Sequence, residues 1–151
     1  MPPLDQIGTV TCSVDPNATF AAQPGNFSFA SGGTGSTSFT FTPPATAGHV
    51  VVTYNAASWG AYDHPAGAHT ISTCCVTTSA TASNGTSIGF NIHNNWPAVG
   101  GGGAGIEYPL SVTSSFTYTG GAVTAYLRCS VTGDSFGGYV SNISATAIST
   151  P

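Results

Sequence analysis

The chain has 151 residues, of which only 4% are charged: one Lys or Arg against five Asp and Glu, with a formal net charge of −4. This length suits one domain with a sizeable core. Contacts to nucleic acid and to anionic membrane surfaces draw on Lys and Arg, so Arg128 alone argues against both partners. Apolar runs such as Val50-Val51-Val52 fall far short of the ~20 residues of a spanning helix, so no membrane span is predicted.

The N-terminus begins Met1-Pro2-Pro3-Leu4-Asp5-Gln6. It has neither a basic region nor an apolar stretch, so no secretory signal is predicted, and we expect synthesis in a host cytoplasm. Residues 1–8 are expected to form an N-terminal arm on a single domain that covers residues 1–151.

Apolar and polar residues alternate with a period of two through most of the chain, which predicts strands that have one buried and one wet face. The predicted strands are residues 9–14, 36–42, 49–56, 69–78, 87–93, 110–119, 122–131 and 138–148. Gly120-Gly121 predicts a two-residue hairpin turn between the strands at 110–119 and 122–131. No stretch shows a helical period. Short strands at this spacing predict an all-β fold, a single-domain antiparallel β-sandwich or jelly roll.

The same alternation predicts which side chains are buried. The expected core positions in the second half are Leu110, Val112, Phe116, Val123, Leu127, Cys129 and Val131. The expected positions on the opposite face are Thr113, Ser115, Thr117 and Thr124.

Aromatic residues in two turn-rich segments are the candidate binding residues. One segment contains Trp59, Tyr62 and His64, and the other is the long irregular stretch 94–105, which contains Trp96. A loop of that length is usually functional or held by a partner. If exposed, these aromatic rings would either anchor a protein interface, which is the commoner use, or stack on sugar rings.

Histidine and cysteine are the candidate metal ligands: His49, His64, His69, His93, Cys12, Cys74, Cys75 and Cys129. They lack the paired short spacings of a structural zinc site, so no metal and no cofactor are predicted. Alternation places Cys12 and Cys129 on core faces, where a free cysteine behaves as a small apolar residue; they would lie close if the first and a late strand were neighbours. Cys74 and Cys75 should point to opposite faces of one strand. His49 and His93 are expected at the surface or in an interface.

Catalytic motifs are also missing from the sequence. The five acids form no recognisable carboxylate pair, and there is neither a Gly-x-Ser-x-Gly elbow nor a phosphate-binding loop. Asp63-His64 is the best local candidate, but a surface loop explains it better. We therefore expect that the protein is not an enzyme.

Two segments carry a resemblance to a known family. Residues 39–50 contain a strand, the turn Pro43-Pro44 and a strand led by Gly48, and residues 108–148 contain closing strands around Gly137-Gly138. Together they resemble TNF/C1q-like jelly rolls, although His49-Val50 replaces the usual aromatic Gly-x-Tyr entry. The resemblance implies a last strand that pairs beside the first strand, and a trimer. Similar small β proteins in tailed phages serve as capsid decoration proteins or fibre tips.

These observations favour a structural role. The expected protein is a capsid decoration, or cement, subunit in a virion, which binds copies of itself and a major capsid or other virion protein. The alternative is a lectin-like or receptor-binding head of a fibre tip or adhesin, which would bind glycans through Trp59, Tyr62 and Trp96.

Overall fold

The computed structural model describes residues 17–30, 32–62, 70–79, 81, 87–92, 104–133 and 137–151. These residues form nine strands: β1 (Ala18–Ala22), β2 (Phe27–Ala30), β3 (Thr34–Phe41), β4 (Ala47–Tyr62), β5 (Thr70–Thr77), β6 (Ser87–Ile92), β7 (Ala104–Thr119), β8 (Val123–Gly133) and β9 (Gly137–Thr150). Strands cover more than half of the chain, well above the ~20–25% of an average globular protein. The described residues contain no helix that could cross a membrane.

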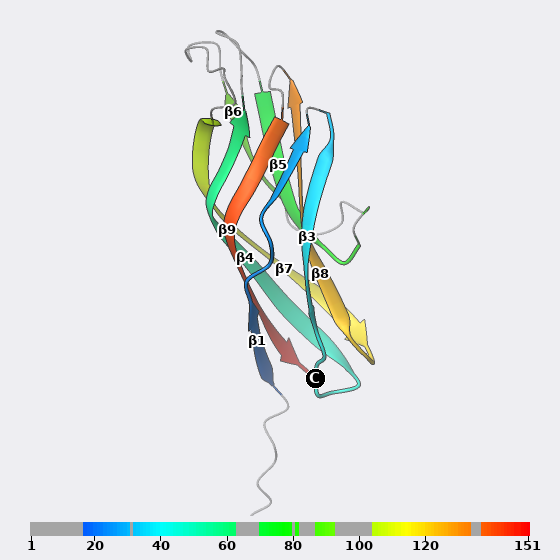
Figure 1. Ribbon diagram of the computed structural model, residues 1–151. Coiled ribbons are helices and arrows are strands. Elements are labelled where there is room, and N and C mark those ends of the chain that lie inside the picture. The colour runs from blue at the N-terminus through cyan, green and yellow to red at the C-terminus, as the bar shows by residue number, and fades with distance from the viewer. Residues whose placement is uncertain are drawn as a thin grey trace, which may run out of the picture.

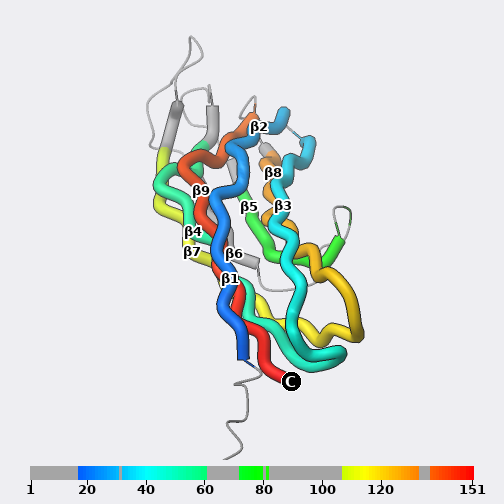
Figure 2. The backbone as a smooth tube through the Cα atoms, turned by 60° about the horizontal axis from the view of Figure 1, so that its bottom comes forward, coloured from blue at the N-terminus to red at the C-terminus, as the bar shows by residue number. Residues whose placement is uncertain are grey.

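The strands form two antiparallel sheets that pack face to face (Figure 1). Sheet A has the order β1-β9-β4-β7, and β2 also pairs with β9; sheet B has the order β3-β8-β5-β6. The chain passes repeatedly from one sheet to the other, and β9 lies beside β1 and β2 along its length (Figure 2). The predicted all-β sandwich is therefore confirmed.

The core lies between the two sheets, where alternate residues of each strand meet. Leu110, Val112, Leu127, Cys129 and Val131 are buried as predicted, and Thr113, Ser115 and Thr117 are exposed. Phe116 and Val123 were predicted to be buried but are half-buried, although both pack against the core, and Thr124 is half-buried where an exposed position was predicted. Tyr54 is completely buried, and its hydroxyl donates a 2.7 Å hydrogen bond to the Ala125 carbonyl of the opposite sheet.

The predicted hairpin at Gly120-Gly121 is wrong. Both glycines have positive φ, 68° and 69°, as a tight turn requires. However, β7 pairs with β4 in sheet A, while β8 pairs with β3 and β5 in sheet B. The Gly120 amide donates to the Thr46 carbonyl, so this turn packs beside the turn that leads into β4. The two glycines mark the turn correctly, but turn residues do not determine which sheet the next strand joins.

The sequence pattern did not predict β1 and β2, which are the first two described strands in chain order. β1 and β2 are short and flank residues 23–26, where Pro24 and Gly25 give a turn signal. Both strands pair with β9, and Phe20 and Phe27 are half-buried against the core. The alternation of Phe27 with Phe29 was the available signal. The predicted strand at 9–14 and the predicted arm at 1–8 lie outside the described residues.

Two strands of sheet A are longer than predicted. β4 begins before and ends after the predicted range 49–56, and β7 begins before the predicted range 110–119. Their pairing shifts register between Ala56 and Trp59, which marks a β-bulge. A bulge inserts an extra residue and interrupts the simple alternation, so the sequence pattern ended there.

Candidate functional site

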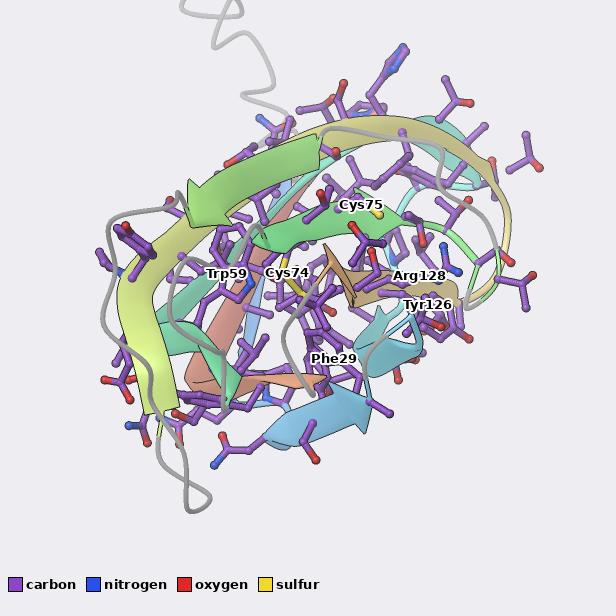
Figure 3. The ribbon with its side chains drawn as sticks, turned by 90° about the horizontal axis from the view of Figure 1, so that it is seen from above. Phe29, Trp59, Cys74, Cys75, Tyr126 and Arg128 are labelled. Carbon is purple, nitrogen blue, oxygen red and sulfur yellow. A yellow bond between two sulfur atoms is a disulfide. The ribbon has the colours of Figure 1, made fainter. Side chains whose placement is uncertain are left out.

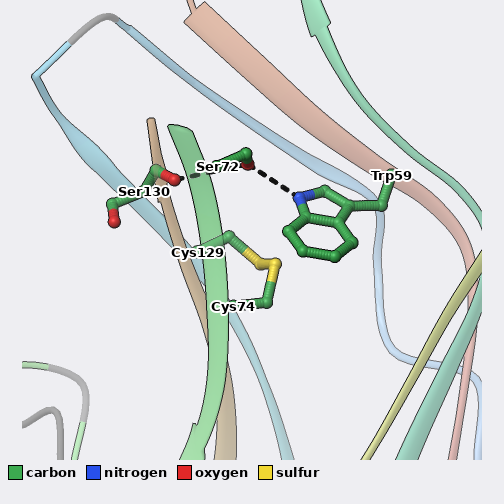
Figure 4. The surroundings of a disulfide bond; sticks show 5 residues. All are labelled: Trp59, Ser72, Cys74, Cys129 and Ser130. Atoms are coloured by element: carbon green, nitrogen blue, oxygen red, sulfur yellow. Dashed lines mark hydrogen bonds between the residues drawn. A yellow bond between two sulfur atoms is a disulfide. The ribbon is translucent and has the colours of Figure 1, made fainter. Parts of the chain in front are cut away.

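Trp59 was a candidate binding residue on the condition that its ring was exposed, but it is a core residue. Its side chain is 2% exposed, and the indole Nε1 donates a 2.9 Å hydrogen bond to Ser72 Oγ (Figure 4). Ser72 Oγ in turn donates to the Ser130 carbonyl at 3.4 Å. The bulge after Ala56 places both Ala56 and Trp59 on the inner face, although they are three positions apart in the sequence. The condition for a binding role at Trp59 is therefore not met, and its side chain instead links the two sheets.

The other predicted binding residues lie wholly or partly outside the described residues. Tyr62 is the last residue of β4, where its backbone pairs with Gly137 of β9. Its side chain, and the whole of His64 and Trp96, lie outside the described residues. The role predicted for these three side chains stays a prediction.

The cysteines include a disulfide that the sequence did not predict. Cys74 of β5 and Cys129 of β8 face each other in register and form a bond of 2.01 Å (Figure 4). The expectation of a free core cysteine at Cys129 is thus wrong, because the β5–β8 pairing places a second thiol directly opposite. Cys12 lies outside the described residues.

Cys75 points to the opposite face of β5 from Cys74, as alternation predicted (Figure 3). It is an unpaired, buried cysteine whose register partner on β8 is Arg128. Burial raises the pKa of the Cys75 thiol, and the nearby Arg128 charge opposes that shift. The thiol therefore remains protonated and unreactive near neutral pH.

The candidate metal ligands fall partly within the described residues. Among the described residues, no three His, Cys, Asp or Glu side chains cluster together. His49 is exposed on β4, in keeping with the predicted surface histidine, while His69 and His93 lie outside the described ranges.

One end of the outer face of sheet A, away from Glu107, is the most distinctive surface of the described structure. It consists mainly of hydroxyl side chains, and we call it the hydroxyl face: Thr19, Ser144, Thr146, Ile148, Thr150, His49, Val51, Thr53, Asn55, Ser111, Thr113, Ser115 and Thr117. The strand register aligns these residues in rows across four strands. In one row, Thr53 Oγ1 and Thr113 Oγ1 form a 2.8 Å hydrogen bond. The hydroxyl face contains no Lys, Arg, Asp or Glu.

Two aliphatic side chains interrupt the hydroxyl face near its centre. Val51 is 43% exposed and Ile148 is 50% exposed, and the two are register partners on β4 and β9. Thr19 and Ser115 complete their row. An isolated exposed aliphatic residue is common, whereas here two such residues lie side by side in a surface without charged side chains.

A hydrogen-bonded cluster lies at the other end of sheet A. Glu107 of β7 accepts hydrogen bonds from the Tyr139 hydroxyl of β9 and from Ser58 Oγ of β4, the latter at 3.4 Å. Gly60 lies between Tyr139 and Glu107 in the strand register. Because Gly60 has no side chain, the Tyr139 phenol can cross β4 and reach the carboxylate.

Two shallow hollows of similar size border β9, one beside β2 and the other beside the end of β1. The first has a volume of about 300 Å³ and is lined by Asn26, Phe27, Ser28, Tyr139, Val140 and Ser141. The second has a volume of about 310 Å³ and is lined by Ala21, Ala22, Gln23, Ser144, Ala145 and Thr146. Between them Asn142 has a positive φ of 52°, and its amide donates a 2.8 Å hydrogen bond to Asn26 Oδ1.

Comparison with known proteins identifies no family: no family model and no curated protein matches the sequence. The solved structures that match this chain include the following two. A chain in the structure of infectious bursal disease virus, Gt strain, is 14% identical with a TM-score of 0.44, over 90% of this chain and 34% of that chain. The enzymatically active domain of tailspike protein 4 from bacteriophage CBA120 is 11% identical with a TM-score of 0.28, over 86% of this chain and 19% of that chain. The chain thus spans about a third and a fifth of these two proteins.

Proposed function

We propose that this protein is a virion structural subunit that associates with copies of itself through the hydroxyl face of sheet A. The observation that carries the proposal is the exposed pair Val51 and Ile148, centred in a face without Lys, Arg, Asp or Glu. Burial of both side chains against a second copy would remove apolar area from water without burying an unpaired charge. Each surrounding hydroxyl group can both donate and accept a hydrogen bond. The hydroxyl faces of two copies can therefore form hydrogen bonds with each other across an interface.

The composition of the whole chain supports the same proposal. Soluble monomers usually depend on surface charge to stay apart, and this chain has only 4% charged residues. A protein with so little charge is best explained if much of its surface contacts other protein in its working state.

Within this class of virion structural proteins, we propose that the chain is a trimeric capsid decoration, or cement, subunit that also contacts a major capsid protein. It rests on the resemblance to TNF/C1q-like jelly rolls, which implies a last strand beside the first. In the described part of the chain, β9 does pair with β1, the first strand there. A buried disulfide suits a protein that works outside a reducing cytoplasm, as a protein on a released particle does. The proposal includes no catalytic role.

The test is the mass of the purified chain in solution as a function of concentration. We expect the wild-type chain to be an oligomer, and Ile148→Asp to shift it to the monomer, because each copy would bury an unpaired carboxylate. Thr132→Asp is the matched control, since Thr132 is exposed on β8 of the other sheet. A monomeric wild-type chain, or an Ile148→Asp variant that retains the oligomeric mass, would contradict the proposal.

A further inference from the structure

We infer that His49 makes self-association through the hydroxyl face sensitive to pH: copies associate while its imidazole is neutral and separate when the imidazole is protonated. The inference rests on the proposed self-association and adds a condition to it. Histidine is the side chain whose charge ordinarily changes between about pH 5 and pH 8. A histidine inside an interface can therefore control that interface over this range.

His49 lies within the hydroxyl face, close to its aliphatic pair. It is exposed on β4, and its register partners are Thr117 on β7 and Thr150 on β9. Val51 is two residues further along β4, so both side chains point to the same side of the strand, about 7 Å apart. A stable interface covers about 800 Å² on each partner, so a copy that covers Val51 would also cover the imidazole.

The described side chains around His49 carry no charge and do not titrate near neutral pH. Those that flank it on the same side of sheet A are Val51 on β4, Ser115, Thr117 and Thr119 on β7, and Ile148 and Thr150 on β9. Their hydroxyl groups can form hydrogen bonds with an imidazole, but none of them can neutralise an imidazolium.

The carboxyl group of Pro151 also lies close to β4, but on its other side. A Cβ atom on Gly48 would be 2.9 Å from the Pro151 carboxyl carbon. Gly48 and His49 are consecutive residues of β4, so their Cβ directions point to opposite faces of the strand. The Pro151 carboxyl group therefore does not share the face on which His49 is exposed.

Protonation of His49 would place an unpaired positive charge in the interface. The hydroxyl face of the second copy has the same composition, so it brings no Asp or Glu to pair with the imidazolium. A buried charge without a partner is costly, and each copy would bury its own, whatever the symmetry of the oligomer. Association therefore favours the neutral imidazole: it is strongest at the upper end of the histidine range and weakens as the pH falls.

The experiment is sedimentation equilibrium of the full chain at about pH 8 and about pH 5, at one salt concentration. A histidine of ordinary basicity is protonated about 30 times more often than it is neutral at pH 5. We therefore expect the association constant of the wild-type chain to fall at least about tenfold between the two conditions. His49→Gln has no charge at either pH, so its association constant should change less than about twofold.

A histidine moved to another position provides the matched control. Thr117 is exposed in the same row as His49, so Thr117→His in the His49→Gln chain should restore the pH dependence. Thr132 is exposed on β8 of sheet B, so Thr132→His in the same chain should not restore it. Near-UV circular dichroism at both pH values should show that each variant retains the fold.

The outcomes separate this inference from the proposed self-association. A wild-type chain that is monomeric at pH 8 would contradict both. A wild-type chain that associates at pH 8 and equally well at pH 5 would overturn the inference alone. Two further results would do the same: a folded His49→Gln chain that keeps the full pH dependence, or Thr132→His restoring it as completely as Thr117→His.

Discussion

At the scale of single residues, the two sheets are joined by buried polar contacts as well as by apolar packing. Trp59 of sheet A donates to Ser72 of sheet B, and Tyr54 of sheet A donates to the Ala125 carbonyl of sheet B. An indole N–H or a phenol buried without a partner would be costly, so these contacts restrict how the sheets can slide past each other. Burial also raises the pKa of the Tyr54 hydroxyl far above its usual value, so the phenol remains a donor.

The contact between Trp59 and Ser72 gives the first prediction. Ser72→Ala removes the acceptor and leaves the buried indole N–H unpaired, so we expect a loss of about 1–3 kcal/mol in the free energy of unfolding. Urea denaturation followed by circular dichroism measures this loss. Thr132→Ala, at an exposed position on β8, is the control and should change the stability by less than about 0.5 kcal/mol. An unchanged midpoint for Ser72→Ala would show that the indole finds another partner.

At the scale of elements, the alternating pattern predicted most of the strands but not how they connect. The faces of the regular parts of β7 and β8 followed directly from period-two alternation, since each strand buries one face. The pattern failed at the bulge beside Trp59, where an extra residue interrupts the alternation. It also failed at Gly120-Gly121, because a two-residue turn looks the same in sequence whether it joins paired strands or crosses between sheets.

The disulfide depends on the pairing of two strands. Cys74 and Cys129 are 55 residues apart in sequence, and only the β5–β8 register places them together. Spacing alone offered no reason to choose Cys74 over Cys75 or Cys12 as the partner of Cys129. The orientation of β5 makes the choice, since it turns Cys74 inward and Cys75 outward.

The second prediction concerns this disulfide. The double variant Cys74→Ala with Cys129→Ala should lower the free energy of unfolding by about 4 kcal/mol, the loop-closure entropy for a separation of 55 residues. Urea denaturation of the oxidised wild type and of the double variant measures the difference. Cys75→Ala is the control, because Cys75 takes no part in the bond, and its effect should be smaller. A double variant as stable as the wild type would show that the bond adds no stability.

At the scale of the whole molecule, the candidate surfaces exist only once the strands are in their sheet order. Thr19, Ile148, Val51 and Ser115 come from four distant parts of the chain and form one row across sheet A. Asn26 and Tyr139 meet in the same way through the pairing of β2 with β9. The sequence indicated a protein made for contacts, through its low charge, but it could not show these rows, because each strand shows only its own alternation.

The last prediction follows from the absence of Lys, Arg, Asp and Glu on the hydroxyl face. If copies associate through this face, ion pairs contribute nothing, and the salt that screens charges has little to weaken. The association constant from sedimentation equilibrium should therefore change less than about twofold between ~0.1 M and ~1 M sodium chloride, a range over which the screening length falls from about 10 Å to 3 Å. Thr117→Lys shows that the assay detects charge: like charges should weaken association at low salt, and high salt should restore it. A wild-type constant that falls tenfold or more over the same range would mean that charged groups outside the hydroxyl face form the interface.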